Sequence, residues 1–431
     1  MEEHINVLNW NIGGAKYLES VKRKRDAWRK KLNRQTKRLL RDIKPYAVTL
    51  QEVVLYGKDE ADGGVQLREL GYVYAEGDKD AKPVCAECVL DVDDLREDYQ
   101  FIPEWLIDTK RHSAMGKWAK LYNNEELGWD EDHFFAQGNA TLVRKDVPRC
   151  GIFHVPTLEN PKGKRGRMIF RMPRHDRPQG ECGENTQCTE VVQLECGLYF
   201  GDRNTEPRVA MVTHLVLDGQ GEPEPGSRET PVRKPLDVFV VNLHLTTLMK
   251  EREGVPVVDE LASQTRLRQL EIVIDGMVSR YNSWRKNDYE VRDSEPLAEV
   301  ESRLPPVWIL AGDFNFTPES VEYETVVRRG FIDMNPLVVV PEPTQLQLRD
   351  APTKAKGPGC EPTITLDYVF VGPRFEAVPP TIGDGRVAQR DMTSKISKVH
   401  EKIDASDHYP VSVSVPISVE LPCIQSSPDG P

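Results

Sequence analysis

The sequence has no long hydrophobic run, because polar residues interrupt its apolar segments well before the roughly 20 residues that cross a bilayer. Its first residues, Met1 to Asn6, have neither the basic region nor the apolar stretch of a secretory signal. Its eight cysteines are dispersed over 431 residues, unlike the dense pattern of a disulfide-stabilised secreted domain. We therefore expect a soluble cytoplasmic protein with reduced cysteines.

The chain also lacks an overall positive charge. Its formal net charge of −12 argues against nucleic-acid binding by the protein's charge as a whole. Residues 16–44 nevertheless contain thirteen Lys or Arg against three Asp or Glu. Apolar residues recur across 21–43 at spacings of four and seven, which predicts a helix with a basic outer face. Such a face can contact nucleic acid, or it can be a solvated surface that binds nothing.

Length alone allows two or three average domains or one large α/β unit. We predict a single catalytic domain over 1–417 and a flexible tail over 418–431. Three segments have weak hydrophobic periodicity and are rich in charged residues, Gly or Pro. We predict that they are insertions, at about 76–135, 156–187 and 218–235. No internal repeat divides the chain.

Polar residues stand where apolar, strand-like runs end. Asn11 follows the run 5–10, Glu52 follows 47–50, and Asp313 follows 307–311. Further strands are predicted at 139–143, 191–195, 210–214, 238–245, 363–371 and 411–415, and an amphipathic helix at 260–281. Strand ends are where α/β proteins place their binding sites.

These polar residues suit the hydrolysis of phosphate esters, which requires neutralised phosphate charge, a nucleophilic water and a stabilised leaving oxygen. Oxygen ligands hold Mg²⁺ or Mn²⁺, and we assign that role to Glu52 and Asn11 with Asp407. His408 is the candidate for acid–base or electrostatic catalysis, with Asp367 as its orienting partner.

Asp313 and Asn315 are two residues apart, so in an extended segment their side chains point into one pocket. The carboxylate can orient or deprotonate water while the amide binds a phosphate oxygen. His244, in Asn242-Leu-His244 at the end of another strand, adds a second phosphate contact.

A structural zinc site is a second possibility for metal binding. Cys85 and Cys88 have the spacing of a zinc knuckle, and Cys182 and Cys188 complete a set of four thiolates. The second spacing is poor, so we favour unligated cysteines.

The ordered set of motifs resembles the endonuclease/exonuclease/phosphatase superfamily, which has a deoxyribonuclease I / exonuclease III-like fold. This resemblance implies an α/β (α+β) fold, a four-layer sandwich of two mainly antiparallel sheets flanked by helices. It also implies that Asn11 and Glu52 bind the metal beside Asp407, and that Asn242 and His244 contact phosphate. The remaining implied residues are the water- and phosphate-positioning pair Asp313 and Asn315, and His408 with its partner Asp367.

Two departures narrow the choice within the superfamily. His244 stands where the abasic-site endonucleases of this superfamily usually carry Tyr. The sequence Thr-Leu-Asp367-Tyr differs from the Trp-Cys-Asp-Arg sequence that is typical of inositol phosphatases. We therefore expect a metal-dependent nuclease acting on DNA or RNA. A phosphatase or a sphingomyelinase-like phosphodiesterase on the same fold is the alternative. An inactive binding scaffold is a third reading, disfavoured by the intact Glu52, Asp313 and His408.

Overall fold

The fold is described by a computed structural model of the chain. The residues that it describes are 4–14, 20–58, 65–66, 85–108, 127, 129, 133–147, 153–155, 170–172, 189–194, 208–220, 233–248, 251–278, 306–335, 337–341, 346–350, 352–355, 362–372, 397–400 and 405–416. None of the helices in this part of the chain has the length and apolar character that a membrane crossing needs.

The first sheet is built around two parallel strands, β1 (His4–Asn11) and β2 (Ala47–Lys58), which α2 (Lys22–Ile43) connects. Its other strands are β19 (Ser397–Val399), β20 (Val411–Pro416), β6 (His133–Arg144), β5 (Tyr99–Asp108), β4 (Cys85–Cys88) and β3 (Val65–Gln66). β20 pairs with β1 and β6 pairs with β2, both antiparallel, so the parallel pair lies inside an otherwise antiparallel sheet.

The second sheet has six strands. In spatial order they are β13 (Ile332–Asp333), β18 (Asp367–Gly372), β12 (Val307–Asp313), β11 (Arg233–His244), β10 (Arg208–Gln220) and β9 (Thr189–Leu194). Of its described pairings, β11 with β12 is parallel and the rest are antiparallel. Three short hairpins stand apart from both sheets: β7 (Phe153–Val155) with β8 (Phe170–Met172), β14 (Leu337–Pro341) with β15 (Leu346–Asp350), and β16 (Lys354–Ala355) with β17 (Pro362–Ile364).

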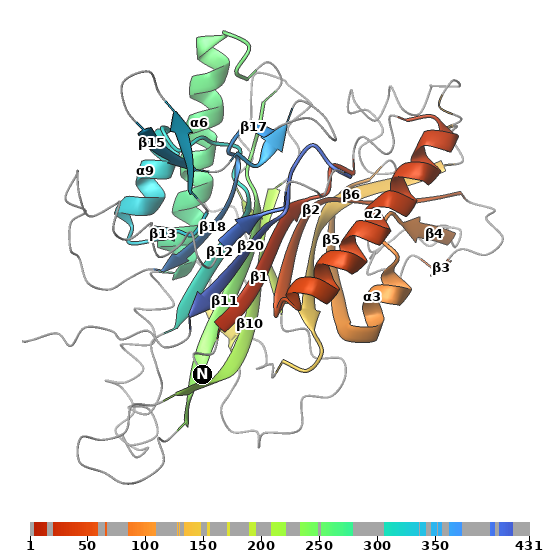
Figure 1. The fold of residues 1–431 in the computed structure, drawn as a ribbon, viewed down its shortest axis with the longest axis horizontal. Coiled ribbons are helices and arrows are strands. Elements are labelled where there is room, and N and C mark those ends of the chain that lie inside the picture. Colours follow the sequence, from red (N-terminus) through yellow and green to blue (C-terminus); the bar gives the residue numbers. More distant parts are fainter. Residues whose placement is uncertain are drawn as a thin grey trace, which may run out of the picture.

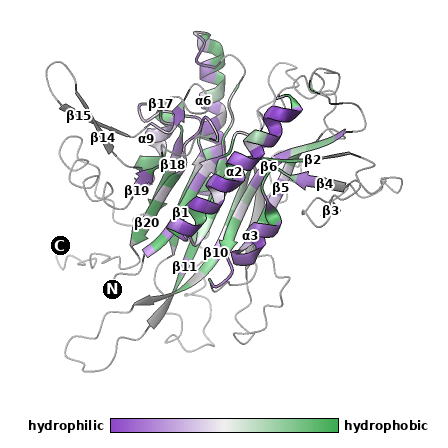
Figure 2. Cartoon of the chain, turned by 45° about the vertical axis from the view of Figure 1, so that its right-hand side comes forward, coloured by the Kyte–Doolittle hydropathy of each residue, from purple (hydrophilic) through white to green (hydrophobic). Residues whose placement is uncertain are grey.

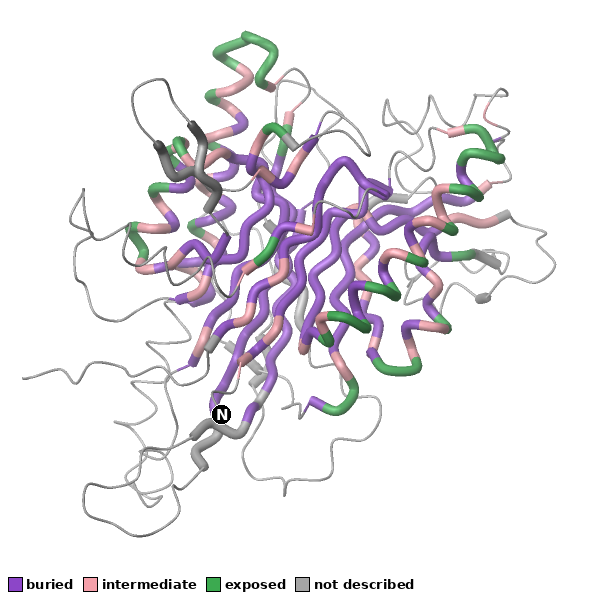
Figure 3. The backbone as a smooth tube through the Cα atoms, viewed as in Figure 1, coloured by how far each residue is buried: buried purple, intermediate pink, exposed green. Residues whose placement is uncertain are grey.

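The two sheets pack face to face and helices cover both outer faces (Figure 1). α2 and α3 (Val92–Asp98) lie on the first sheet. α6 (Pro256–Glu271), its π-helical continuation η3 (Ile272–Val278) and α9 (Val321–Arg328) lie on the second. The strands between these layers are almost wholly buried (Figure 3). The predicted four-layer α/β sandwich of mainly antiparallel sheets is therefore confirmed.

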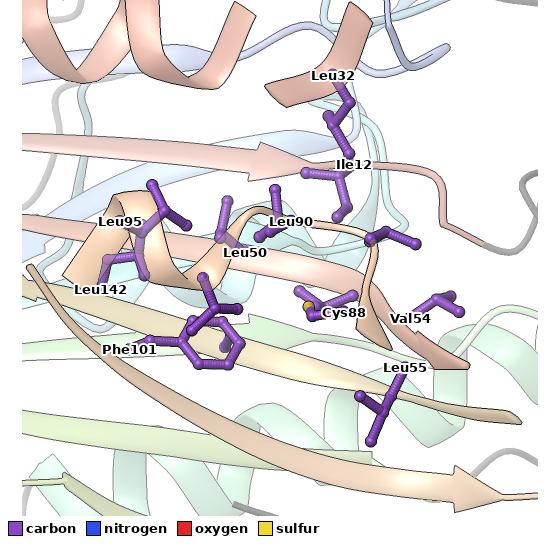
Figure 4. Packing of buried hydrophobic residues seen from close by; sticks show 14 of the residues in the cluster. Ile12, Leu32, Leu50, Val54, Leu55, Cys88, Leu90, Leu95, Phe101 and Leu142 are labelled. Atoms are coloured by element: carbon purple, nitrogen blue, oxygen red, sulfur yellow. The ribbon is translucent and has the colours of Figure 1, made fainter. Parts of the chain in front are cut away.

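The basic helix predicted at 21–43 is α2, and its apolar stripe packs on the first sheet. Leu32 and Leu39 are buried, and Figure 4 shows Leu32 pointing onto Ile12 at the end of β1. The helix ends at Lys44, which adopts a left-handed conformation (φ 49°). Pro45 follows Lys44 and disfavours helical geometry at the residue before it, which fixes this end.

Part of the segment expected to be an insertion belongs to the first sheet. Within 76–135 the chain forms β4, α3 and β5, and β5 pairs with β6 along its length. β5 contains Pro103 and a register shift between Trp105 and Ile107, so the regular alternation that marks a strand is broken. The segment 218–235 includes the outer ends of the β10–β11 hairpin. Most of 156–187 and all of 418–431 lie outside the described residues.

A buried polar network joins the two sheets. Gln51 of β2 donates from Nε2 to Oδ1 of Asn242 on β11 at 2.8 Å and to Oδ1 of Asn9 on β1 at 3.0 Å. Asn242 Nδ2 donates to the carbonyl oxygen of Ala140 at 2.8 Å, and Asn9 Nδ2 to that of Gly312 on β12 at 3.1 Å. These contacts fix how one sheet sits on the other, because a buried polar group that loses its partner is costly.

Replacing Asn242 with alanine is expected to destabilise the fold. Asn242→Ala leaves the buried carbonyl groups of Leu50 and Ala140 without the hydrogen bond that Asn242 donates to them. It also removes the oxygen that accepts from Gln51. We expect the free energy of unfolding to fall by about 2 to 4 kcal/mol, measured by urea denaturation. Thr141→Val is the control, since it removes a single 3.4 Å contact of Asn242 and is expected to cost less than about 1 kcal/mol. Equal losses in the two variants would contradict this role for Asn242.

Candidate active site

Polar side chains from both sheets meet at one edge of the sandwich. β1 and β2 end or bend there, β11 and β12 end there, and β18 and β20 begin there. Contacts link seven of the nine residues predicted from the sequence: Asn11, Glu52, His244, Asp313, Asn315, Asp367 and His408. Asp407 lies beside the turn at Gly13, next to Asn11.

The carboxylate of Asp313 is the centre of this cluster. It is 1% exposed, and its Oδ2 accepts a hydrogen bond from Asn11 Nδ2 at 3.0 Å. His408 Nε2 and His244 Nε2 stand 3.7 Å and 3.8 Å from the same oxygen, beyond hydrogen-bond distance. Oδ1 accepts from the backbone N–H of Asn315 at 3.0 Å, which fixes the Asp-Phe-Asn turn. Three polar groups therefore converge on one carboxylate oxygen.

Burial and charge act in opposite directions on Asp313. Burial alone raises its pKa, but the positive charges of His408, His244 and Lys354 outweigh burial and lower the pKa to about 2. Asp313 is consequently a carboxylate at neutral pH.

His408 is held as a charged imidazolium by its neighbours. Burial alone lowers its pKa, but the charges of Asp367 and Asp313 prevail and raise the pKa to about 9. Its Nδ1 lies 2.8 Å from Asp367 Oδ2, so Asp367 orients the ring and directs Nε2 toward Asp313. The pair expected from the sequence is thus brought together by the fold.

Thr353 holds Asp367 in place, and sequence reasoning missed it. Its hydroxyl donates to Asp367 Oδ2 at 2.8 Å and accepts from the backbone N–H groups of Leu366 and Asp367 at 3.1 and 3.0 Å. The next residue, Lys354, pairs with His408 as an isolated β-bridge. No motif marks Thr353, because it lies in a short connection and acts on Asp367 across β16 and β17.

Glu52 occupies a strained position, and this differs from the expected strand end. β2 continues to Lys58, but its register with β6 shifts between Leu50 and Val53, and Glu52 has φ 55°. A bulge thus places Glu52 at the site edge while the strand runs on. Gly14 donates its N–H to Glu52 O at 3.1 Å, and a Cβ at Gly14 would lie 2.1 Å from that oxygen. Only glycine fits there.

Two further residues with positive φ lie at the same edge. Asn315 (φ 54°) donates a hydrogen bond from Nδ2 to Leu245 O at 3.1 Å. The guanidinium of Arg252 (φ 66°) donates a hydrogen bond to Asn315 O. Such backbone strain concentrates at functional sites. Arg252 is a cation that sequence reasoning missed, since it lies in a turn with no recognisable motif.

Asn242 does not join the cluster. It was expected to contact phosphate, but it is fully buried and its amide is committed to Gln51 and to two backbone carbonyls between the sheets. Its contacts join the two sheets, and the predicted phosphate contact stays untested.

The donor set around Glu52 fits a hard divalent cation. Asn11 donates to Glu52 Oε1 at 3.3 Å, and Asn11 Oδ1 accepts from Gly13 N–H at 2.9 Å. A Cβ at Gly13 would lie 3.4 Å from Asp407 Oδ1, so Asp407 stands beside this turn. Carboxylate and amide oxygens are the ligands that Mg²⁺ and Mn²⁺ prefer.

Another group, Asp313, Asp367 and His408, has potential ligand atoms within 4.8 Å of one another. These three residues are thus a second place where carboxylate and imidazole groups could hold a cation. The Nδ1 of His408 is bonded to Asp367, so only its Nε2 faces Asp313.

The thiolate set considered for zinc gains no support where the structure describes it. Cys85 and Cys88 lie on the extended strand β4. Cys88 is buried in the core, and burial raises the pKa of its thiol to about 12, whereas zinc binds thiolates. Cys182 and Cys188 lie outside the described residues.

Comparison with protein families finds a match over the C-terminal part of the chain. The model of the endonuclease/exonuclease/phosphatase family matches residues 291–408, the segment that contains Asp313, Asn315, Asp367, Asp407 and His408. This matched segment is similar to the family that the motifs resemble. Members of that family include nucleases, phosphodiesterases and phosphatases. No curated protein matches the sequence.

Several solved structures are similar. One is D. rerio TDP2 complexed with a single-strand DNA product, with 12% identity, coverage of 95% of this chain and 98% of that one, and a TM-score of 0.37. A second is the human nocturnin catalytic domain with a bound sulfate anion, with 13% identity, coverage of 96% and 94%, and a TM-score of 0.34. A third is ANGEL2, a 2′,3′-cyclic phosphatase in complex with adenosine-2′,3′-vanadate, with 12% identity, coverage of 96% and 95%, and a TM-score of 0.41.

Removing the hydroxyl of Thr353 is expected to impair phosphoric ester hydrolysis. Thr353→Val preserves the shape of the side chain but leaves Asp367 without one donor and two buried N–H groups without an acceptor. We expect kcat on bis(p-nitrophenyl) phosphate to fall about 5- to 100-fold, the equivalent of about 1 to 3 kcal/mol. Thr353→Ser keeps the hydroxyl and is expected to retain most of the rate. A Thr353→Val enzyme that is folded at the assay temperature and has the wild-type kcat would contradict this role.

Proposed function

We propose that this protein is a divalent-metal-dependent phosphodiesterase, and specifically a nuclease that hydrolyses DNA or RNA by activated water. The single observation that carries the proposal is the convergence on Asp313 Oδ2 of Asn11, His244 and His408, with Asp367 behind His408. At this place the buried carboxylate can accept a proton, and the two imidazole rings beside it can donate hydrogen bonds.

The metal belongs to the Glu52 side of the site. Glu52, Asn11 and Asp407 would hold Mg²⁺ or Mn²⁺, which would neutralise phosphate charge and stabilise the leaving oxygen. For Asn11 to contribute its oxygen, its side-chain amide has to rotate, since Oδ1 is directed to Gly13 N–H and Nδ2 to the two carboxylates.

The remaining residues act on water and phosphate. Asp313, a carboxylate with a pKa of about 2, orients the attacking water. His408, an imidazolium at neutral pH, donates from Nε2 to a phosphate oxygen and stabilises the charge that develops there. His244 supplies a second donor, and Asn315, held by Asp313 and Leu245, positions the phosphate. Asp367 and Thr353 keep His408 oriented.

Several features favour a nuclease within the broad class. The basic helix α2 provides local positive charge on an acidic protein, as polyanionic substrates require. The sequence around His244 and Asp367 departs from abasic-site enzymes and inositol phosphatases. A phosphatase or sphingomyelinase-like phosphodiesterase is the alternative on the same fold. We also propose a cytoplasmic location, which the dispersed cysteines support.

The proposal predicts metal-dependent turnover of nucleic acid that requires Glu52 and Asp313. Single- and double-stranded DNA, RNA, phosphoinositide and sphingomyelin are each incubated with Mg²⁺, Mn²⁺ or chelator. We expect nucleic-acid hydrolysis that chelator abolishes. Glu52→Gln and Asp313→Asn are expected to lower kcat/KM by about 100-fold or more, because each removes a charged group from the reaction centre.

Asp146→Asn is the matched control, since it neutralises an exposed acid just after β6, at the end of the sheet away from the site edge. It is expected to keep the wild-type rate. Turnover of phosphoinositide or sphingomyelin alone would establish the alternative class of substrate. A complete lack of turnover would favour a binding scaffold, and full activity in Glu52→Gln and Asp313→Asn would overturn the assignment of the site.

A further inference from the structure

A basic groove runs along α2 on the outside of the first sheet. Asn33 joins the helix to the neighbouring β4–α3 segment, donating from Nδ2 to Val89 O at 3.1 Å and accepting from Asp91 N–H at 2.8 Å. Figure 2 shows hydrophilic residues along the outer side of α2. Six cationic residues line the groove: Arg29, Lys30, Arg34, Lys37, Arg38 and Arg41. Asp26 and Asp91 line it as well.

The helix keeps a large positive excess after its local ion pairs are counted. α2 carries eleven Lys or Arg and two Asp. Arg29 pairs with Glu87, Lys37 with Asp94, and Asp42 with two arginines, in contacts that are all solvent-exposed. Exposed pairs contribute little and exchange readily for another anion.

Two cations stand out within the groove. Lys30 and Arg34 are both exposed and lie four residues apart on α2, about 6 Å along its axis. No ion pair to either is recorded among the described residues. They are therefore the cations of this groove best placed to meet an external anion.

The groove has the chemistry of a nucleic-acid surface and lacks that of a protein interface. Protein interfaces are centred on buried aromatic or aliphatic anchors and are depleted in Lys. Along the described helix, Val21 at the N-cap is the exposed large apolar side chain, and it does not line the groove. Nucleic-acid interfaces are instead polar and rich in Lys and Arg that contact phosphates.

α2 also touches both segments that carry the candidate active site. The Arg29 guanidinium lies 5.7 Å from the centre of the Tyr56 ring, four residues beyond Glu52 on β2. On another side of the helix, the Trp28 indole donates to Ala405 O, and Gln35 Oε1 accepts from Ala405 N–H at 2.9 Å. Ala405 is two residues before Asp407. One end of the groove is therefore close to the site edge.

We propose that the α2 groove is a second binding surface, which holds the sugar–phosphate backbone of the same nucleic-acid strand that enters the active site. The predicted effect of this surface on catalysis rests on the proposed nuclease function. Binding of nucleic acid to the surface does not, because binding is measured without turnover. Lys30 and Arg34 contact phosphates directly, and Arg29, Lys37, Arg38 and Arg41 exchange their carboxylate partners for phosphate as the strand binds.

The geometry sets the length of strand that reaches this surface. The groove extends along α2 from Arg29 to Arg41, twelve residues or about 18 Å. At about 3.4 Å per stacked nucleotide this is the length of about five nucleotides. A tetranucleotide is therefore too short to occupy the active site and the groove together, whereas a 20-nucleotide strand is long enough for both.

The test is salt-dependent binding of labelled 20-nucleotide single-stranded DNA and RNA in chelator, followed by fluorescence anisotropy. For single strands the slope of log affinity against log salt is about −0.7 for each phosphate neutralised. We expect Lys30→Gln/Arg34→Gln to bind more weakly, with a slope smaller in magnitude by about 1.4. Lys145→Gln/Arg328→Gln removes the same charge from exposed positions on the β6 turn and α9, and is expected to keep the wild-type slope.

Activity then separates this proposal from the proposed function. If the protein is a nuclease, the Lys30→Gln/Arg34→Gln variant is expected to hydrolyse a tetranucleotide at the wild-type rate and the 20-nucleotide strand with a raised KM and an unchanged kcat. An absence of turnover with a reduced salt slope would reject the nuclease and keep the surface. An unchanged slope, or an equal loss of binding to a poly-glutamate peptide, would overturn the nucleic-acid surface whether or not the protein is a nuclease.

Discussion

The negative charge of Asp313, buried where two sheets meet, imposes the arrangement of the rest of the site. A carboxylate that is 1% exposed stays ionised only if positive or hydrogen-bonding groups surround it. Asn11 from the first sheet and His244 and His408 supply them. His408 is itself buried and charged, so it needs a second carboxylate, Asp367, whose Oδ2 in turn accepts from a threonine hydroxyl. Each buried charge is stabilised by a partner, and that partner in turn requires its own hydrogen bond or opposite charge. The resulting set of oriented groups is suited to phosphoric ester hydrolysis.

Such a site requires the two sheets to keep one relative position, because Asn11 and Asp313 belong to different sheets. Ångström-scale sliding would separate a pair that now lies 3.0 Å apart. Apolar packing between the sheets is strong but non-directional, so it does not fix their register. The directional part comes from the buried amides of Asn9, Gln51 and Asn242, which bond across the sheets immediately beside the site. Asn242 thus aligns the strands that carry the candidate site residues.

The sequence was sufficient for the parts of this arrangement that follow from local pattern. Apolar runs ending in Asn11 and Asp313 predicted strands that deliver polar groups to one edge. The prediction that Asp313 and Asn315 point into one pocket assumed an extended segment, whereas Asn315 lies in a turn with φ 54° and its side chain donates to Leu245 O. Contacts made across the fold left no such pattern. Thr353 reaches Asp367 through a short hairpin, and the bulge at Glu52 depends on a glycine turn that packs against its backbone. Asn242 is the opposite case. The sequence showed that it matches a family motif, but not that its side chain is buried between the two sheets.

The segregation of charge bears on how a polyanion approaches such a site. The chain is acidic overall, while α2 alone carries eleven basic and two acidic residues. If a strand binds as proposed, attraction confined to one helix would favour a single track and a faster encounter. Trp28 and Gln35 bond to the backbone of Ala405, two residues before Asp407, and so tie α2 to the segment that carries Asp407 and His408. A strand bound to α2 as proposed would therefore be positioned relative to His408 through these contacts.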